Sequence, residues 1–146
     1  MAIENELIKI KAPQFWEEFA RGYGISEVIL IKGDGSYKSM IIGDIVVINL
    51  HYREVGGYRK ILDVECYEEV ITAKFLHELA HYIKKHYVQK MKQGKIITLE
   101  DVCERTLEEI LADPCEREAW DFVLEFKHEK PELFQALVES LKACLH

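Results

Sequence analysis

The residues of this sequence with the clearest chemical meaning are the two histidines and the glutamate of the segment His77-Glu78-Leu79-Ala80-His81. Residues four apart on a helix lie on the same face, one turn apart. Two imidazoles placed in this way can bind one zinc ion at about 2.0–2.1 Å. Zinc lowers the pKa of its bound water towards about 7. We therefore predict that His77 and His81 bind zinc and that Glu78 is the general base that takes the proton from this water.

The alternative interpretation is a surface helix that carries two unrelated histidines, because short motifs also occur by chance. An apolar row at four-residue spacing runs through the segment and comprises Tyr67, Ile71, Phe75, Leu79 and Ile83. Further apolar residues on other sides predict a helix over residues 64–88 that is central to the domain. A buried helix face with two histidines and a glutamate needs polar partners. This requirement favours metal binding.

A catalytic zinc site of this kind needs a third protein ligand. The metzincin pattern H-E-x-x-H-x-x-G-x-x-H does not continue here, because Lys84 occupies the glycine position and Tyr87 the last histidine position. His86 comes one residue too early and is interpreted as a surface histidine. The other common solution is a glutamate from a later helix.

A later segment, Glu116-Arg117-Glu118-Ala119-Trp120-Asp121-Phe122-Val123, offers such a glutamate. The two segments together resemble the gluzincin peptidases, and most closely the ImmA/IrrE-like family. Members of that family carry H-E-x-x-H on one helix and E-x-E-A-[N/D]-x-F-A on a later one. The resemblance covers the layout of residues 25–125 and implies that Glu116 is the third zinc ligand.

Two positions of the later segment depart from the family pattern. Trp120 stands where the family has Asn or Asp, a residue that supports a histidine ligand through a hydrogen bond. Val123 replaces the final small residue. Asp121 is the candidate to take over the support.

Glu116 also has a structural interpretation that needs no metal. Asp113-Pro114-Cys115-Glu116 has the form of a capping box, in which the glutamate faces the start of its own helix. A glutamate in that position would not reach the two histidines. The other possible ligands of this region are Glu118 and Asp121 and, after them, Cys115 and His128.

The remaining elements are predicted from apolar patterns and turn residues. Helices are expected at residues 13–20, 99–111 and 114–127 and from Pro131 onwards, and strands at 27–32, 39–42 and 45–50. The turn Gly33-Asp34-Gly35 predicts that residues 39–42 return beside residues 27–32 as a hairpin. Trp16 and Trp120 are interpreted as core residues.

Strands grouped before helices predict an α+β fold. We expect a small, mostly antiparallel sheet packed on a helical layer, with the H-E-x-x-H helix at its centre in a zincin-like arrangement. The family resemblance adds a strand ahead of this helix whose edge docks the substrate backbone, and residues 45–50 are the candidate. The 146 residues are expected to form one domain, residues 1–146.

Composition excludes several classes of function. The net charge of -7 disfavours a nucleic-acid partner. No apolar run approaches the roughly 20 residues of a membrane span, and no secretory signal is evident, so we expect a cytoplasmic protein. The four cysteines form no Cys-x-x-Cys pair and are expected to be buried thiols.

These observations lead to one functional prediction. The chain is expected to be a zinc-dependent peptidase that hydrolyses a peptide bond in a partner protein, and the resemblance suggests a transcriptional regulator as this partner. The alternative is a catalytically weak or inactive module that zinc stabilises for binding or regulation, which the Trp120 departure motivates. A metal-free helical protein with an accidental motif is the third interpretation.

Overall fold

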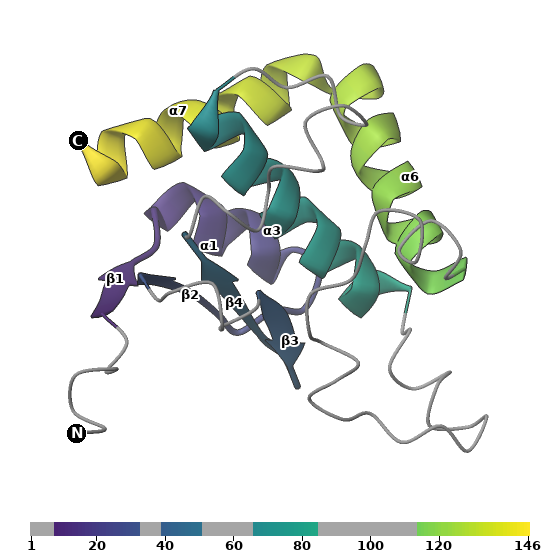
Figure 1. Ribbon diagram of the computed structural model, residues 1–146, viewed down its shortest axis with the longest axis horizontal. Coiled ribbons are helices and arrows are strands. Elements are labelled where there is room, and N and C mark those ends of the chain that lie inside the picture. The colour runs from purple at the N-terminus through teal and green to yellow at the C-terminus, as the bar shows by residue number, and fades with distance from the viewer. Residues whose placement is uncertain (1–7, 33–38, 51–65, 85–113) are drawn as a thin grey trace.

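The computed structural model describes residues 8–32, 39–50, 66–84 and 114–146. The helix expected at residues 99–111 lies outside these ranges, as do His86 and Tyr87. The described residues form an α+β fold, as predicted, in which the helices lie to one side of a small sheet (Figure 1).

The sheet contains four strands in the order β1-β2-β4-β3. Their bounds are β1 Ile8–Lys11, β2 Glu27–Lys32, β3 Met40–Ile42 and β4 Ile45–Asn49. The pairs β1–β2 and β3–β4 are antiparallel, whereas β2 and β4 are parallel. The sheet is therefore mixed, and β1, at one of its edges, was not predicted.

The predicted hairpin between β2 and β3 is wrong. β3 pairs instead with β4, through a tight turn in which Ile42 lies opposite Ile45. Gly43 occupies this turn with a φ of 63°, a conformation that two-residue hairpin turns require and glycine adopts readily. The more buried β4 takes the central position beside β2, where Val28 lies opposite Val46.

This strand order also corrects the predicted role of residues 45–50. β4 has a paired strand on each side, so it cannot accept a further strand along its length. The edge of the sheet on this side is β3. Its residue Ile42 is 57% exposed, and α3 packs against both β3 and β4.

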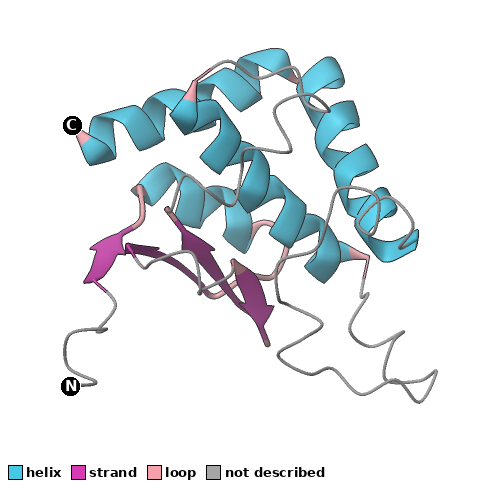
Figure 2. Cartoon of the chain, in the orientation of Figure 1, coloured by secondary structure: helices cyan, strands magenta, loops and turns pink. Residues whose placement is uncertain are grey.

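Four helices complete the described fold (Figure 2). They are α1 Gln14–Arg21, α3 Tyr67–Ile83, α6 Pro114–Glu129 and α7 Pro131–Leu145. Every residue of α3 from Val70 to His81 is buried. Because α3 packs against β3, β4, α6 and α7, it is the central helix, as its apolar pattern predicted. None of the helices in the described ranges combines the length and apolar character needed to cross a membrane.

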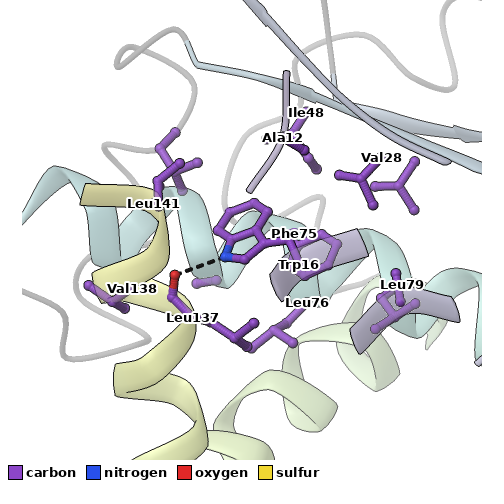
Figure 3. Close-up of a cluster of buried hydrophobic side chains, with 14 of the residues drawn as sticks. Ala12, Trp16, Val28, Ile48, Phe75, Leu76, Leu79, Leu137, Val138 and Leu141 are labelled. Carbon is purple, nitrogen blue, oxygen red and sulfur yellow. Dashed lines mark hydrogen bonds between the residues drawn. The ribbon is translucent and has the colours of Figure 1, made fainter. Parts of the chain in front are cut away.

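The core joins three helices through one tryptophan (Figure 3). The Trp16 ring stacks on Phe75 of α3, with ring centroids 4.4 Å apart and planes 8° apart. Its indole N–H donates a hydrogen bond of 2.8 Å to the carbonyl of Leu137 in α7. This arrangement confirms Trp16 as a core residue and ties α1 to both α3 and α7.

Side chains of α3 also hold the end of β4. The Tyr67 hydroxyl donates to the carbonyl of Leu50, and Lys74 Nζ donates to the carbonyl of Asn49 at 3.2 Å. Tyr67 and Lys74 are seven residues apart and therefore share one face of the helix. Near the other end of α3, the Tyr82 hydroxyl donates to the carbonyl of Gly24 at 3.2 Å. These bonds fix the sheet relative to the residues on α3.

Candidate metal centre

The two histidines and Glu116 converge across the contact between α3 and α6. His77 Nε2 lies 2.9 Å from one carboxylate oxygen of Glu116, and His81 Nε2 lies 3.1 Å from the other. The two Nε2 atoms are 3.1 Å apart. The structure therefore brings together the three residues that were predicted to bind the metal, and they form a group that could hold an ion.

Helix geometry explains how each side chain is positioned. His77 and His81 lie on successive turns of α3, with their ring planes at 90° and their centroids 4.6 Å apart. Glu116 lies in the first turn of α6 and reaches across to α3. Its carboxylate faces the two imidazoles and not a cap of its own helix, so the geometry favours the ligand interpretation.

Protonation alone does not satisfy these contacts. If both Nε2 atoms of His77 and His81 carried hydrogens, both could donate to Glu116, but two donors would then face each other at 3.1 Å. If one of them were unprotonated, its lone pair would face a carboxylate oxygen. While Glu116 is a carboxylate, one of the three contacts is therefore unfavourable in either state, whereas a cation attracts all three groups at once. The donor set fits a metal ion.

The distances also suit a small divalent ion. Four ligands around an ion at about 2.0–2.1 Å, arranged as a tetrahedron, lie about 3.3 Å from one another. The observed separations of 2.9 to 3.1 Å are slightly shorter. Two neutral imidazoles and one carboxylate are a common ligand set of catalytic zinc sites. The residues present therefore fit zinc.

The three side chains are largely buried, and Glu116 is the most exposed of them. The side chains of His77 and His81 are 7% and 5% exposed, and that of Glu116 is 20% exposed. Within the described ranges, no further His, Cys, Asp or Glu joins this group. The described residues therefore supply three ligands, one fewer than a closed structural zinc site has.

The surroundings hold both kinds of ligand in the form that a metal requires. Burial lowers the pKa of His77 to about 4, although Glu116 acts in the opposite direction. Burial alone would raise the pKa of Glu116, but the hydrogen bonds from His77 and His81 bring it well below its ordinary value. At neutral pH, His77 is therefore neutral and Glu116 is a carboxylate.

Glu78, the predicted general base, lies on the same helix between the two ligands. Its position is about 100° around the helix from His77 and about 60° from His81. The residue is 8% exposed. The structure therefore has a buried carboxylic acid side chain next to the two histidines in the sequence of α3.

Besides Glu116, α6 brings the ring of Trp120 against His77. The two rings are stacked, with centroids 3.9 Å apart and planes 29° apart. From the sequence, Trp120 was predicted only to be a core residue and a departure from the family pattern. Its stacking on His77 was not predicted. Asp121, expected to support a ligand, is exposed and forms no hydrogen bond with His77 Nδ1. That expectation is wrong, because Asp121 lies on a different side of α6 from Trp120.

The other residues considered as ligands lie outside the group. Glu118 and His128 are exposed and Cys115 is half-buried. Lys74, a buried cation one turn before His77, was not predicted to lie near the site. Besides burial, its charge contributes to the lowered pKa of His77. The sequence signal that could have pointed to it is the four-residue spacing between Lys74 and Glu78, which places both on one helix face.

The cysteines of the described ranges are less buried than predicted. Cys66 and Cys115 are half-buried and Cys144 is exposed.

Comparison with known proteins adds no assignment. No family model matches the chain, and neither a curated protein nor a solved structure matches it.

Proposed function

We propose that this protein is a zinc-dependent peptidase whose metal is held by His77, His81 and Glu116. The observation that carries the proposal is the convergence of Glu116, from α6, with the two imidazoles of α3. Chance placement of an H-E-x-x-H segment would not bring a carboxylate from another helix onto both rings. The helix order, with this segment on a central helix beside a small sheet, supports a zincin-like arrangement.

Each group has a role in peptide hydrolysis. Zinc, when bound, supplies the Lewis acidity that polarises a carbonyl and lowers the pKa of water towards about 7. Glu78 accepts the proton of the attacking water and passes it on to the leaving amine. A metal-binding imidazole must be neutral, the state in which His77 is held at neutral pH, and Glu116 supplies one negative charge. The burial of the three ligands restricts competing water, and the more exposed Glu116 side admits the substrate.

The substrate is proposed to be an extended segment of a partner protein. β3 is the sheet edge beside α3, and an extended peptide can pair with such an edge through its backbone. This role belongs to β3 because β4 is paired on both sides. The resemblance of the two motifs to the ImmA/IrrE-like family supports a transcriptional regulator as the partner.

One observation favours the alternative of a zinc-stabilised binding module with little or no turnover. Trp120 occupies the position from which the family's Asn or Asp supports a histidine ligand, and it offers a ring face where that residue offers a carboxylate or an amide. A ligand without that support is a weaker donor. In this alternative the protein binds zinc and its partner but does not cleave it.

Substitution of Glu78 separates the two functions. Glu78→Gln keeps the shape of the side chain but removes the base, so we expect one bound zinc per chain and a loss of cleavage of at least about 100-fold. The measurement combines metal analysis with mass spectrometry of a diverse peptide library incubated with the protein. Glu69→Gln, in the first turn of the same helix, is the matched control and should cleave as the parent does. Equal cleavage by the Glu78 variant would refute the assigned role, and zinc binding without any cleavage by the parent would favour the alternative.

A further inference from the structure

Trp120 lies against His77 one helical turn after Glu116 on α6. Residues four apart share a helix face, so α6 presents a metal ligand and an aromatic ring to the same region of α3. The Trp120 and His77 rings are stacked at a centroid distance of 3.9 Å. Trp120 is fully enclosed, with 2% of its surface exposed. The indole is therefore part of the wall of the metal centre.

Among the described residues, the second nitrogen of His77 lacks the hydrogen bond that such ligands normally make. A histidine that binds a metal usually donates its other N–H to a carboxylate or carbonyl, which fixes the orientation of the ring. His77 Nδ1 is buried, and no residue in the described part of the chain forms a hydrogen bond with it. Packing must therefore set the orientation of the ring.

We propose that Trp120 is the positioning residue of the metal centre, because its stacked indole holds the His77 ring at the angle at which Nε2 meets His81 and Glu116. This inference rests on the zinc site of the proposed function. A flat ring in contact with one face of an imidazole obstructs rotation about the Cβ–Cγ bond of the histidine. Shape and contact thus replace the hydrogen bond that supports comparable ligands.

The first test measures zinc affinity by competition with a chromogenic chelator. Trp120→Leu removes the flat ring, and we expect a loss of affinity of about 10- to 100-fold, the usual effect of removing a ligand's support. Trp120→Phe keeps a flat ring and should retain most of the affinity. Trp16→Leu is the matched control, because it removes the other buried tryptophan, which stacks on Phe75, and should leave the affinity unchanged.

The second test is spectroscopic and leaves Trp120 and the three metal-binding side chains unchanged. The chain contains two tryptophans, so Trp120 is the only one left in Trp16→Phe. Zinc binding at His77 places a cation on the ring that Trp120 contacts. We therefore expect the Trp120 emission to change on zinc titration and to reach its endpoint at one equivalent. In Trp120→Phe, the emission of Trp16 should not respond.

The outcomes separate this inference from the proposed function. If the parent protein binds no zinc, both fail. If the parent binds zinc, but Trp120→Leu binds it as tightly as Trp16→Leu does, the positioning role is wrong and the peptidase proposal is unaffected. If Trp120→Leu does not fold, as judged by circular dichroism, the emission decides: an unchanged Trp120 signal in the zinc-loaded Trp16→Phe protein overturns the inference, and a change that saturates at one equivalent supports it.

Discussion

The Glu116 carboxylate lies 2.9 Å from Nε2 of His77, although the two residues belong to different helices. The same carboxylate meets His81 through its other oxygen. Because α3 is buried along its whole middle section and packs against α6, the positions of these groups are set by the core and not by a surface loop. The fold itself therefore brings the three side chains together.

The buried site makes the metal-free protein sensitive to acid. The pKa of His77 is about 4 in the folded chain, whereas an imidazole in an unfolded chain has a pKa of about 6.5. Between these values the unfolded state binds more protons, so stability falls as the pH drops from about 6.5 to about 4 and is fully present above that window. The lowered pKa of Glu116 acts in the same direction at still lower pH.

We therefore expect His77→Gln to remove most of the acid sensitivity between pH 6.5 and pH 4. In the parent protein, His77 is expected to lower the free energy of unfolding by on the order of 3 kcal/mol between pH 6.5 and pH 4. Urea unfolding of the metal-free forms at several pH values measures it. If the free energy of unfolding depends on pH in the same way in the parent and in His77→Gln, His77 is not the group that causes the acid sensitivity. His128→Gln, an exposed change on α6, is the control and should follow the parent.

The histidine pair could be predicted from local spacing alone, because two residues four apart on one helix share a face whatever the rest of the fold is. The third ligand required the resemblance to a known family, and the structure brings Glu116 to the place that this resemblance implied. Trp120 could not be assigned to His77 in the same way. Whether the Trp120 ring meets the His77 ring depends on how α6 packs on α3. The sequence contains no periodic pattern that predicts this contact.

The sheet shows where local signals conflict. Both Gly33-Asp34-Gly35 and Gly43-Asp44 are turn sequences, and either could have formed the hairpin. The structure has the tighter Gly43 turn between β3 and β4, and β2 lies parallel to β4. The choice depends on burial of β4 at the centre of the sheet, which is a property of the whole domain.

The buried ammonium of Lys74 is expected to stabilise the junction between α3 and β4. Its hydrogen bond to the carbonyl of Asn49 is made in the interior, where a charged donor contributes about 1.5–3 kcal/mol. Lys74→Met should lower the free energy of unfolding by a similar amount. Lys84→Met, an exposed change at the end of the same helix, should have a far smaller effect. Equal stabilities of the two variants in urea unfolding would show that the Lys74 bond is not important for the fold.

The outer edge of β3 can be tested with proline. In an antiparallel ladder the backbone groups of successive residues point alternately to the partner strand and away from it. Counting from the Ile42–Ile45 pair that closes the tight turn, the N–H of Ile41 points away from β4. Ile41→Pro removes this donor, so we expect weaker substrate binding, seen as a raised KM with an unchanged zinc content.

Ile41→Val is the control, because it keeps the N–H and most of the side chain. Its KM should equal that of the parent. A parent-like KM for the proline variant, with its zinc content intact, would rule out β3 as the docking strand.

The central claim is that three side chains from two helices share one divalent ion, and the binding of zinc to Glu116→Gln tests it most directly. Competition titration against a chelator should give one zinc per parent chain and a loss of affinity of more than about 100-fold in this variant, because removing a ligand exceeds the 10- to 100-fold effect of losing a supporting residue. Glu118→Gln, an exposed change on the same helix, should bind as the parent does. Zinc bound equally well by the parent and Glu116→Gln, or by neither, would contradict the account.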